Sequence, residues 1–233
     1  MNIEPNIIYE DNHIIVVIKP HNISVQEDES KDIDMLTIIK DFIKERDKKT
    51  GNVFLGLVHR LDRPTGGVMV FAKTSKAASR LSKQLKDKQL KKKYLCVING
   101  RPQLIQNRLT TYLKKDEKTN TVHIAPKLEL GAKEAILEYE VIETKNKYTL
   151  VEVDLITGRS HQIRVQMSSQ LNNPIYADFK YGDKDHSGNL ALWAYELTFT
   201  HPTTKENMKF RVAPAYDNSI FKIFEPTIEK MIN

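Results

Sequence analysis

Short apolar segments that end at turn-forming residues constrain the fold of this chain more than any other feature. The segment IIVVI begins at Ile14 and runs towards Pro20, and the segments EAILEYEVIET and KYTLVEVDLI are joined through Lys145-Asn146. Runs of β-branched and aromatic residues bounded in this way are typical of strands paired in hairpins. Because such runs outnumber helical ones, we expect an α+β fold with a mixed, largely antiparallel β-sheet and flanking helices.

Three segments show the spacing of amphipathic helices. The first lies between Asp32 and Arg46, and the second begins at Ser75, which we expect to be its N-cap. The third, SHQIRVQMSSQL, places its apolar residues on one side and is expected to be capped by Ser160. No Pro/Gly/Ser-rich linker divides the chain, so we expect a single domain that covers residues 1–233.

The composition excludes several classes of protein. Hydrophobic residues make up 40% and charged residues 28% of the 233 residues, which is typical of a globular chain. The longest apolar runs are too short to span a bilayer, and the N-terminus has no secretory signal. A lone cysteine, Cys96, cannot form an internal disulfide, which suits a reducing compartment. We expect a cytoplasmic protein with no membrane partner, and a monomer as its default state.

Positive charge is concentrated in one part of the chain. The formal net charge is +6, from 36 basic and 30 acidic residues. The segment from Ser75 to Tyr94 carries many cations and only one acid, Asp87. This concentration favours a polyanionic partner such as nucleic acid. The alternative is a solvated lysine face on a surface helix.

No motif indicates a bound metal or nucleotide cofactor. The chain has no C-x-x-C and no H-E-x-x-H, and its histidines are scattered. The segment GNVFLG has the glycine spacing of a phosphate-binding loop, but Leu57 and Val58 follow where that loop needs Lys and Ser or Thr. An enzyme with this sequence would therefore work with its side chains alone.

The segment HRLDRPTGG combines charge with turn-forming residues. Asp62 lies between Arg60 and Arg63, immediately before Pro64. A cation beside a carboxylate favours the charged form, which a nucleophile or a base requires at neutral pH. The pattern therefore indicates either a catalytic carboxylate or an ordinary surface ion pair.

A second charged segment, LITGRSHQIRVQM, bends at Gly158 and continues into the third predicted helix. Arg159, His161 and Arg164 lie on its first turns, and the last two share one helical face. The N–H groups at a helix start, placed beside arginines, can bind an anion. The alternative is a structural turn with surface ion pairs.

Taken in order, HRLDRPTGG, KKY (Lys92 to Tyr94) and TGRSHQIR resemble the three signature stretches of the RluA-like family of RNA pseudouridine synthases. The segment PIYADFKYG resembles a further G-D-x-x-Y-G stretch of that family, with Ala177 in place of a glycine. The resemblance runs from about Ile7 to Val212. It implies the pseudouridine synthase fold with a central catalytic cleft, as a stand-alone catalytic domain without the S4 domain of some relatives.

The resemblance implies an isomerase that breaks the N1–C1′ bond of a uridine, turns the base and rejoins it through C5, with no cofactor. Its motifs assign Asp62 as the catalytic aspartate, Arg164 as its ion-pair partner and Tyr94 as the aromatic that packs against the flipped base. Arg60 matches the residue that enters the RNA stack. The remaining candidates, which would shape the site or contact phosphate, are Lys92, Arg159 and His161.

The expected substrate is ribosomal RNA, transfer RNA or both, and the motifs do not say which uridine is modified. One alternative is an RNA-binding protein of the same fold that has lost catalysis, and the presence of Asp62, Tyr94 and Arg164 together argues against it. Another is a hydrolase that splits a nucleoside or glycoside bond. Most such enzymes need two carboxylates, and Asp178 is the only other candidate in the motif stretches.

Overall fold

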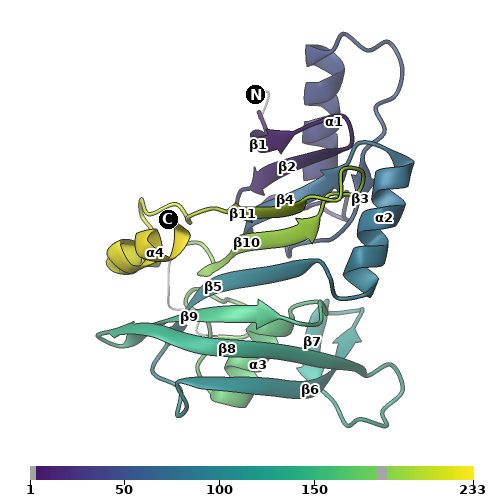
Figure 1. The fold of residues 1–233 in the computed structure, drawn as a ribbon. Coiled ribbons are helices and arrows are strands. Elements are labelled where there is room, and N and C mark those ends of the chain that lie inside the picture. The colour runs from purple at the N-terminus through teal and green to yellow at the C-terminus, as the bar shows by residue number, and fades with distance from the viewer. Residues whose placement is uncertain (1–3, 183–187) are drawn as a thin grey trace. The chain divides into compact units, whose positions relative to one another are not determined.

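The computed structural model describes residues 4–182 and 188–233 of the chain (Figure 1). The chain divides into two compact units, each made from two segments. Unit 1 comprises Met1–Lys91 and Glu196–Val212, and unit 2 comprises Lys92–Tyr195 and Ala213–Asn233. That the two units form one catalytic domain stays a prediction.

Unit 1 is built on strands in the order β1-β2-β4-β10-β11, with the short strand β3 beside β4. Strands β1, β2 and β4 pair antiparallel, as do β10 and β11. Strands β2 and β4 form the centre, because their side chains are buried on both faces. The strands span Asn6–Glu10 (β1), Ile14–Lys19 (β2), Gly56–Leu57 (β3), Gly66–Ala72 (β4), Leu192–Thr200 (β10) and Asn207–Arg211 (β11).

Helices α1 (Met35–Arg46) and α2 (Ser75–Lys86) complete unit 1. Helix α2 buries Ala77 and Leu81 in an apolar cluster that also contains side chains of β2, β4 and β10. Helix α1 buries Ile39 completely. Both predicted helices are therefore confirmed.

Both helix starts differ from the prediction. Helix α1 is capped by Asp34, whose carboxylate accepts from Thr37 N at 3.1 Å, so the residues from Asp32 to the cap lie outside the helix. Helix α2 is capped by Thr74, which has an extended φ of −136°. The prediction that Ser75 is the N-cap was wrong, because Ser75 is already the first helical residue.

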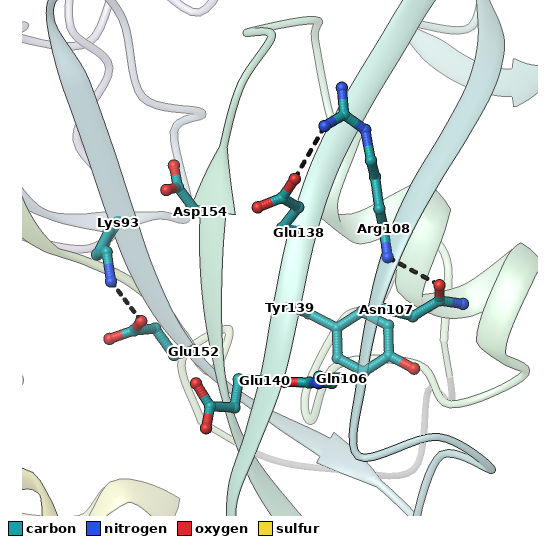
Figure 2. Close-up of a pocket in the computed structure, with 9 residues that line it drawn as sticks. All are labelled: Lys93, Gln106, Asn107, Arg108, Glu138, Tyr139, Glu140, Glu152 and Asp154. Carbon is teal, nitrogen blue, oxygen red and sulfur yellow. Dashed lines mark hydrogen bonds and ion pairs between the residues drawn. The ribbon is translucent and has the colours of Figure 1, made fainter.

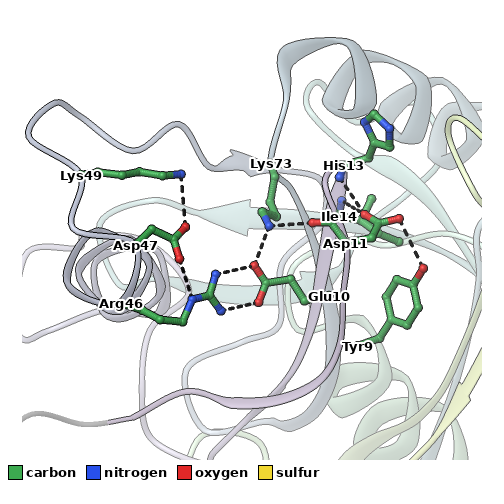
Figure 3. A network of polar contacts seen from close by, with 9 residues as sticks. All are labelled: Tyr9, Glu10, Asp11, His13, Ile14, Arg46, Asp47, Lys49 and Lys73. Carbon is green, nitrogen blue, oxygen red and sulfur yellow. Dashed lines mark hydrogen bonds and ion pairs between the residues drawn. The ribbon is translucent and has the colours of Figure 1, made fainter.

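A network of ion pairs ties the β1–β2 hairpin to α1 and to the end of β4 (Figure 3). Glu10 pairs with Arg46 of α1 at 2.6 Å and with Lys73, which follows β4, at 2.5 Å. Hydrogen bonding to Arg46, together with Lys73, lowers the pKa of Glu10 to about 2. Asp11 closes the hairpin by accepting from Ile14 N at 2.8 Å. Strands β1 and β2 thus pair antiparallel around this turn.

Unit 2 contains strands in the order β5-β9-β8-β6-β7, all paired antiparallel, and the first residues of β10, Leu192 to Tyr195, also belong to it. The predicted hairpin of β8 and β9 is confirmed, and its turn includes Asn146 with a left-handed φ of 54°. These strands span Lys91–Asn99 (β5), Gln106–Asp116 (β6), Thr121–Ile124 (β7), Lys133–Lys145 (β8) and Tyr148–Leu155 (β9).

Helix α3 (Gln162–Leu171) covers one face of the unit 2 sheet, where Val165 packs with Ala135 of β8. Two C-terminal elements, the 3-10 helix η1 (Ile220–Phe224) and helix α4 (Glu225–Ile232), were not anticipated from the sequence. The predicted α+β architecture, with largely antiparallel pairing and flanking helices, is confirmed. Across residues 4–182 and 188–233, no helix is both long and apolar enough to cross a membrane.

Candidate active site

Asp62 lies in unit 1, in the loop between β3 and β4. Thr65 N donates to Asp62 O at 2.9 Å, so residues 62–65 form a turn. His59 anchors the start of the loop, because its buried Nε2 accepts from Val70 N of β4 at 3.2 Å. The half-buried carboxylate of Asp62 is therefore carried by a loop that is fixed on both sides.

Lys19, at the end of β2, supports this loop from a fully buried position. Its Nζ donates to the carbonyl oxygens of Pro20, Ile23 and Arg63 at 2.8, 2.6 and 3.0 Å. Three acceptors match the three N–H donors of an ammonium group. Burial lowers the pKa of Lys19 to about 7, while the charge of Asp62 raises it and that of Arg63 lowers it. Sequence reasoning missed this residue, although a lysine directly after a buried strand was an available signal.

The two arginines that flank Asp62 have different surroundings. Arg63 pairs through Nη2 with Asp32, and its Nη1 lies 3.6 Å from Asp28. Arg60 is exposed, and its side chain makes no hydrogen bond or ion pair in the described part of the chain. The folded surroundings of Asp62 therefore differ from what its two sequence neighbours suggest.

Lys92 and Tyr94 lie on β5 in unit 2 and point to the same face, because they are two residues apart on a strand. Tyr94 is buried and lies opposite Val153 of β9. Lys92 approaches Gly158 so closely that a Cβ at that glycine would lie 3.1 Å from its Nζ. Burial lowers the pKa of Lys92 to about 8. The KKY and TGRSHQIR segments thus meet within unit 2.

The turn that leads into α3 is stabilised by Gln162 and not by Ser160. Gln162 Oε1 accepts from Thr157 Oγ1 at 2.8 Å and from Arg159 N at 3.0 Å. His161 is the N-cap, with a left-handed φ of 52° and no capping hydrogen bond from its side chain. The prediction that Ser160 caps the helix was wrong, because the amide of Gln162 satisfies the turn and Ser160 is exposed.

Arg159 and His161 are each held by a contact in unit 2. Arg159 is exposed and donates from Nε to Glu134 O at 2.8 Å. His161 Nδ1 lies 2.6 Å from the hydroxyl of Tyr181. The guanidinium carbon of Arg164 lies 5.1 Å from the centre of the same Tyr181 ring. His161 and Arg164 thus both contact Tyr181, but the prediction that Arg159 and His161 lie on the first turns of the helix was wrong, because α3 begins at Gln162 and only Arg164 is helical.

Arg164 is buried and forms a bidentate ion pair with Asp178. Its Nε donates to Oδ2 at 2.8 Å and its Nη2 donates to Oδ1 at 2.7 Å. Both oxygens of Asp178 are thus engaged, which argues against a role as the second carboxylate of a hydrolase. The predicted ion pair between Arg164 and Asp62 would join a residue of unit 2 to one of unit 1, and it stays a prediction.

The predicted site residues divide between the two units. Unit 1 contains Arg60 and Asp62, and unit 2 contains the others, which are Lys92, Tyr94, Arg159, His161 and Arg164. Within the ranges that the structure describes, no group of His, Cys, Asp or Glu could hold a metal ion. Unit 1 thus supplies a carboxylate on an anchored loop and one cation, and unit 2 supplies an aromatic ring and further cations. Such cations are suited to an anionic substrate.

A cavity of about 450 Å³ in unit 2 is lined by none of these residues (Figure 2). Lys93 pairs with Glu152 at 2.6 Å and Arg108 pairs with Glu138 at 2.9 Å in its wall. Two further carboxylates, Glu140 and Asp154, also line it. An excess of carboxylates repels a phosphate backbone, so this cavity does not fit the RNA-binding role expected from the sequence.

Comparison with known proteins shows which family this chain belongs to. The family described as RNA pseudouridylate synthase matches residues 13–169, and the chain belongs to it. The chain is 35% identical over 217 residues to ribosomal large subunit pseudouridine synthase C of Buchnera aphidicola subsp. Baizongia pistaciae, a match that covers 87% of this chain and 64% of the relative. It is 33% identical over 218 residues to ribosomal large subunit pseudouridine synthase D of Neisseria meningitidis serogroup B, covering 88% and 57%. The chain thus spans less than two thirds of the length of these curated relatives.

Two solved structures of human proteins are similar to this chain. Human RNA pseudouridylate synthase domain containing 4 has a TM-score of 0.77 and 21% identity, and the match covers 97% of this chain and 93% of that one. Human RNA pseudouridylate synthase domain containing 1 has a TM-score of 0.74 and 21% identity, with 93% and 86% covered. At these identities the likeness shows the fold alone, and the predicted pseudouridine synthase fold is confirmed.

Proposed function

We propose that this protein is an RNA pseudouridine synthase, an isomerase that converts specific uridines in RNA to pseudouridine without a cofactor. The observation that carries the proposal is that the family match over residues 13–169 includes Asp62, Tyr94 and Arg164. The relatives are named as ribosomal large subunit pseudouridine synthases, which favours ribosomal RNA as the substrate. Transfer RNA is the second candidate, because the signature motifs are shared by enzymes of both kinds.

In this reaction the N1–C1′ bond breaks, the uracil turns and C5 bonds to C1′, while C5 loses a proton and N1 gains one. The carboxylate of Asp62 acts as a nucleophile or as a base. The contacts of Lys19 and His59 support this role, because they hold the loop in place before the substrate arrives. A phenol ring at Tyr94 suits packing against a uracil that has left the RNA stack.

The cations of α2 and of the residues after it would contact the RNA backbone. Two of them are committed to protein contacts: Lys83 pairs with Asp87 at 2.6 Å, and Arg80 donates to Pro202 O at 2.8 Å. The other exposed lysines of the same segment are Lys76, Lys86, Lys88 and Lys91. Contacts of this kind make RNA binding strongly dependent on salt concentration. We infer that these lysines supply the electrostatic part of RNA binding, and that Arg60 enters the RNA stack.

The proposal is tested with RNA that carries tritium at uridine C5 and comes from cells lacking this protein. Rejoining the base through C5 displaces that hydrogen, so released tritium counts the reaction. We expect release by wild type and a loss of more than about 10³-fold in Asp62→Ala. The matched control is Asp41→Ala, which removes an exposed aspartate from α1 and should leave the rate unchanged.

Each other outcome points to a specific alternative. RNA binding without tritium release by wild type would favour the RNA-binding protein that lacks catalysis. Equal release by wild type and Asp62→Ala would refute the role of Asp62. Free uracil among the products would favour the hydrolase.

A further inference from the structure

Residues 175–182 of unit 2 form two successive turns, the first closed by Asp178 N donating to Ile175 O at 3.1 Å. Gly182 N donates to Asp178 O at 2.8 Å, and a Cβ at Gly182 would lie only 3.0 Å from that same oxygen. Ala177 has a left-handed φ of 57°, at the position where the resembling family has glycine. These two turns bring two side chains, those of Asp178 and Tyr181, to one arginine of α3.

The carboxylate of Asp178 is oriented by its own turn as well as by Arg164. Its Oδ1 accepts from Lys180 N and from Tyr181 N, each at 3.1 Å. The same carboxylate binds Nε and Nη2 of Arg164, which form one edge of the guanidinium group. Because the guanidinium is planar, a bidentate contact on one edge fixes the plane and the direction of Nη1 on the other edge.

Tyr181 holds the guanidinium from a second direction. The guanidinium carbon of Arg164 lies 5.1 Å from the centre of the Tyr181 ring, within the range of a cation–π contact. The Tyr181 hydroxyl accepts from Val122 N at 2.8 Å, so it can donate its own proton to Nδ1 of His161 at 2.6 Å. Its carbonyl oxygen accepts from Ser168 Oγ at 2.5 Å. The ring is therefore fixed at its tip and at its backbone.

We propose that Asp178 and Tyr181 are positioning residues, which hold the guanidinium of Arg164 in its working orientation before RNA binds. This rests on the proposed function, because it gives Arg164 a place in the reaction. An arginine side chain has several rotatable bonds. When they are already fixed in the folded protein, the catalytic step does not bear the entropy cost of ordering them. Asp178 also balances the charge of the buried arginine, which would be unfavourable without a partner.

Two variants separate positioning from folding. Asp178→Asn keeps the shape of the side chain and loses its charge, whereas Tyr181→Leu removes the ring and leaves the Arg164–Asp178 pair. We expect kcat for tritium release to fall about 10²-fold in Asp178→Asn and about 10-fold in Tyr181→Leu, with KM for RNA changed less than about 3-fold. Glu138→Gln is the matched control, because it breaks the arginine–carboxylate pair with Arg108 elsewhere in unit 2. It should leave kcat unchanged.

A double variant tests whether Asp178 acts through Arg164. In an Arg164→Met background, Asp178→Asn should lower kcat by less than about 2-fold further, because the group it positions is gone. A full additional loss in the double variant would show that Asp178 acts independently and would overturn the proposal. Should Asp178→Asn fail to fold by circular dichroism, Tyr181→Leu combined with Arg164→Met gives the same test.

A measurement that does not depend on activity tests the positioning of Arg164 separately from the proposed function. The Nε proton of Arg164, followed by NMR, should exchange slowly with solvent in wild type and faster in Asp178→Asn. Equally fast exchange in both would overturn the positioning role. Wild type that releases no tritium would refute the proposed function itself. Active wild type with unchanged kcat in both folded variants would refute only the positioning of Arg164.

Discussion

Replacing Lys19 by methionine should change how the stability of this protein depends on pH. Lys19 is fully buried, and its Nζ contacts three backbone carbonyls, including that of Arg63 beside Asp62. Burial lowers its pKa to about 7 from the ordinary value of 10.5. In the folded protein Lys19 therefore gives up its proton at a much lower pH than it does in the unfolded chain.

The sign of the effect follows from which state binds more protons. Between pH 7 and pH 10.5 the unfolded chain keeps a proton on Lys19 that the folded protein has lost, so the free energy of unfolding rises with pH. The rise approaches about 1.4 kcal/mol per pH unit. Because the folded group is half protonated near pH 7, the gain from pH 7 to pH 9 is about 2 kcal/mol. A methionine cannot titrate, so Lys19→Met should lose this gain.

Urea unfolding followed by circular dichroism at pH 7, 8 and 9 measures the effect. The free energy of unfolding of wild type minus that of Lys19→Met should increase by about 2 kcal/mol over this range. Other titrating groups, including Lys92, are present in both proteins and cancel in the difference. Lys76→Met, which replaces an exposed lysine, should show no such trend. A constant difference would show that the three carbonyls and Asp62 keep Lys19 charged, and would refute the reasoning that desolvation dominates.

Two other cations of the candidate site give predictions that RNA binding and turnover can check. Burial lowers the pKa of Lys92 to about 8, so its charge is present below pH 8 and lost above it. Filter binding should show that RNA affinity falls between pH 7 and pH 9 in wild type and not in Lys92→Arg, which stays charged; an identical fall in both would assign it to another group. Arg60→Lys keeps the charge and loses the planar group that can stack on bases, so kcat should fall about 10-fold with an unchanged salt dependence of binding. An unchanged kcat would instead place Arg60 on phosphate, because lysine keeps the charge that such a contact needs.

Secondary structure could be predicted from the sequence wherever the spacing of apolar residues repeats over several turns of a helix or where a turn residue separates two strands. The apolar spacing of α1 and α2 and the turn residue Asn146 identified two helices and a hairpin. Helix caps were less predictable, because Thr74 and Ser75 can both accept the capping hydrogen bond and only the backbone conformation decides between them. At α3 a glutamine inside the helix, Gln162, satisfies the preceding turn, which the usual capping preferences do not anticipate.

The residues of the candidate site could be found because each lies in a contiguous motif, but their partners could not. Arg164 pairs with Asp178, which follows Ala177 in a left-handed conformation that alanine seldom adopts. Lys19 looks like the polar end of an apolar strand, and its three carbonyl partners come from backbone that carries no sequence signal. Contacts that depend on loop conformation therefore lie outside what spacing alone can predict.

The charge pattern around Asp62 shows how sequence neighbours differ from neighbours in the fold. In the sequence this carboxylate stands between two arginines, which suggests a local ion pair that keeps it charged. In unit 1, Arg63 is instead bound to Asp32, while Lys19 is the cation whose pKa the charge of Asp62 raises. Arg60 is exposed and has room to meet a substrate. The two flanking arginines thus have separate surroundings: Arg63 holds the loop that carries the carboxylate, and Arg60 stays exposed, where the proposed function has it contact RNA.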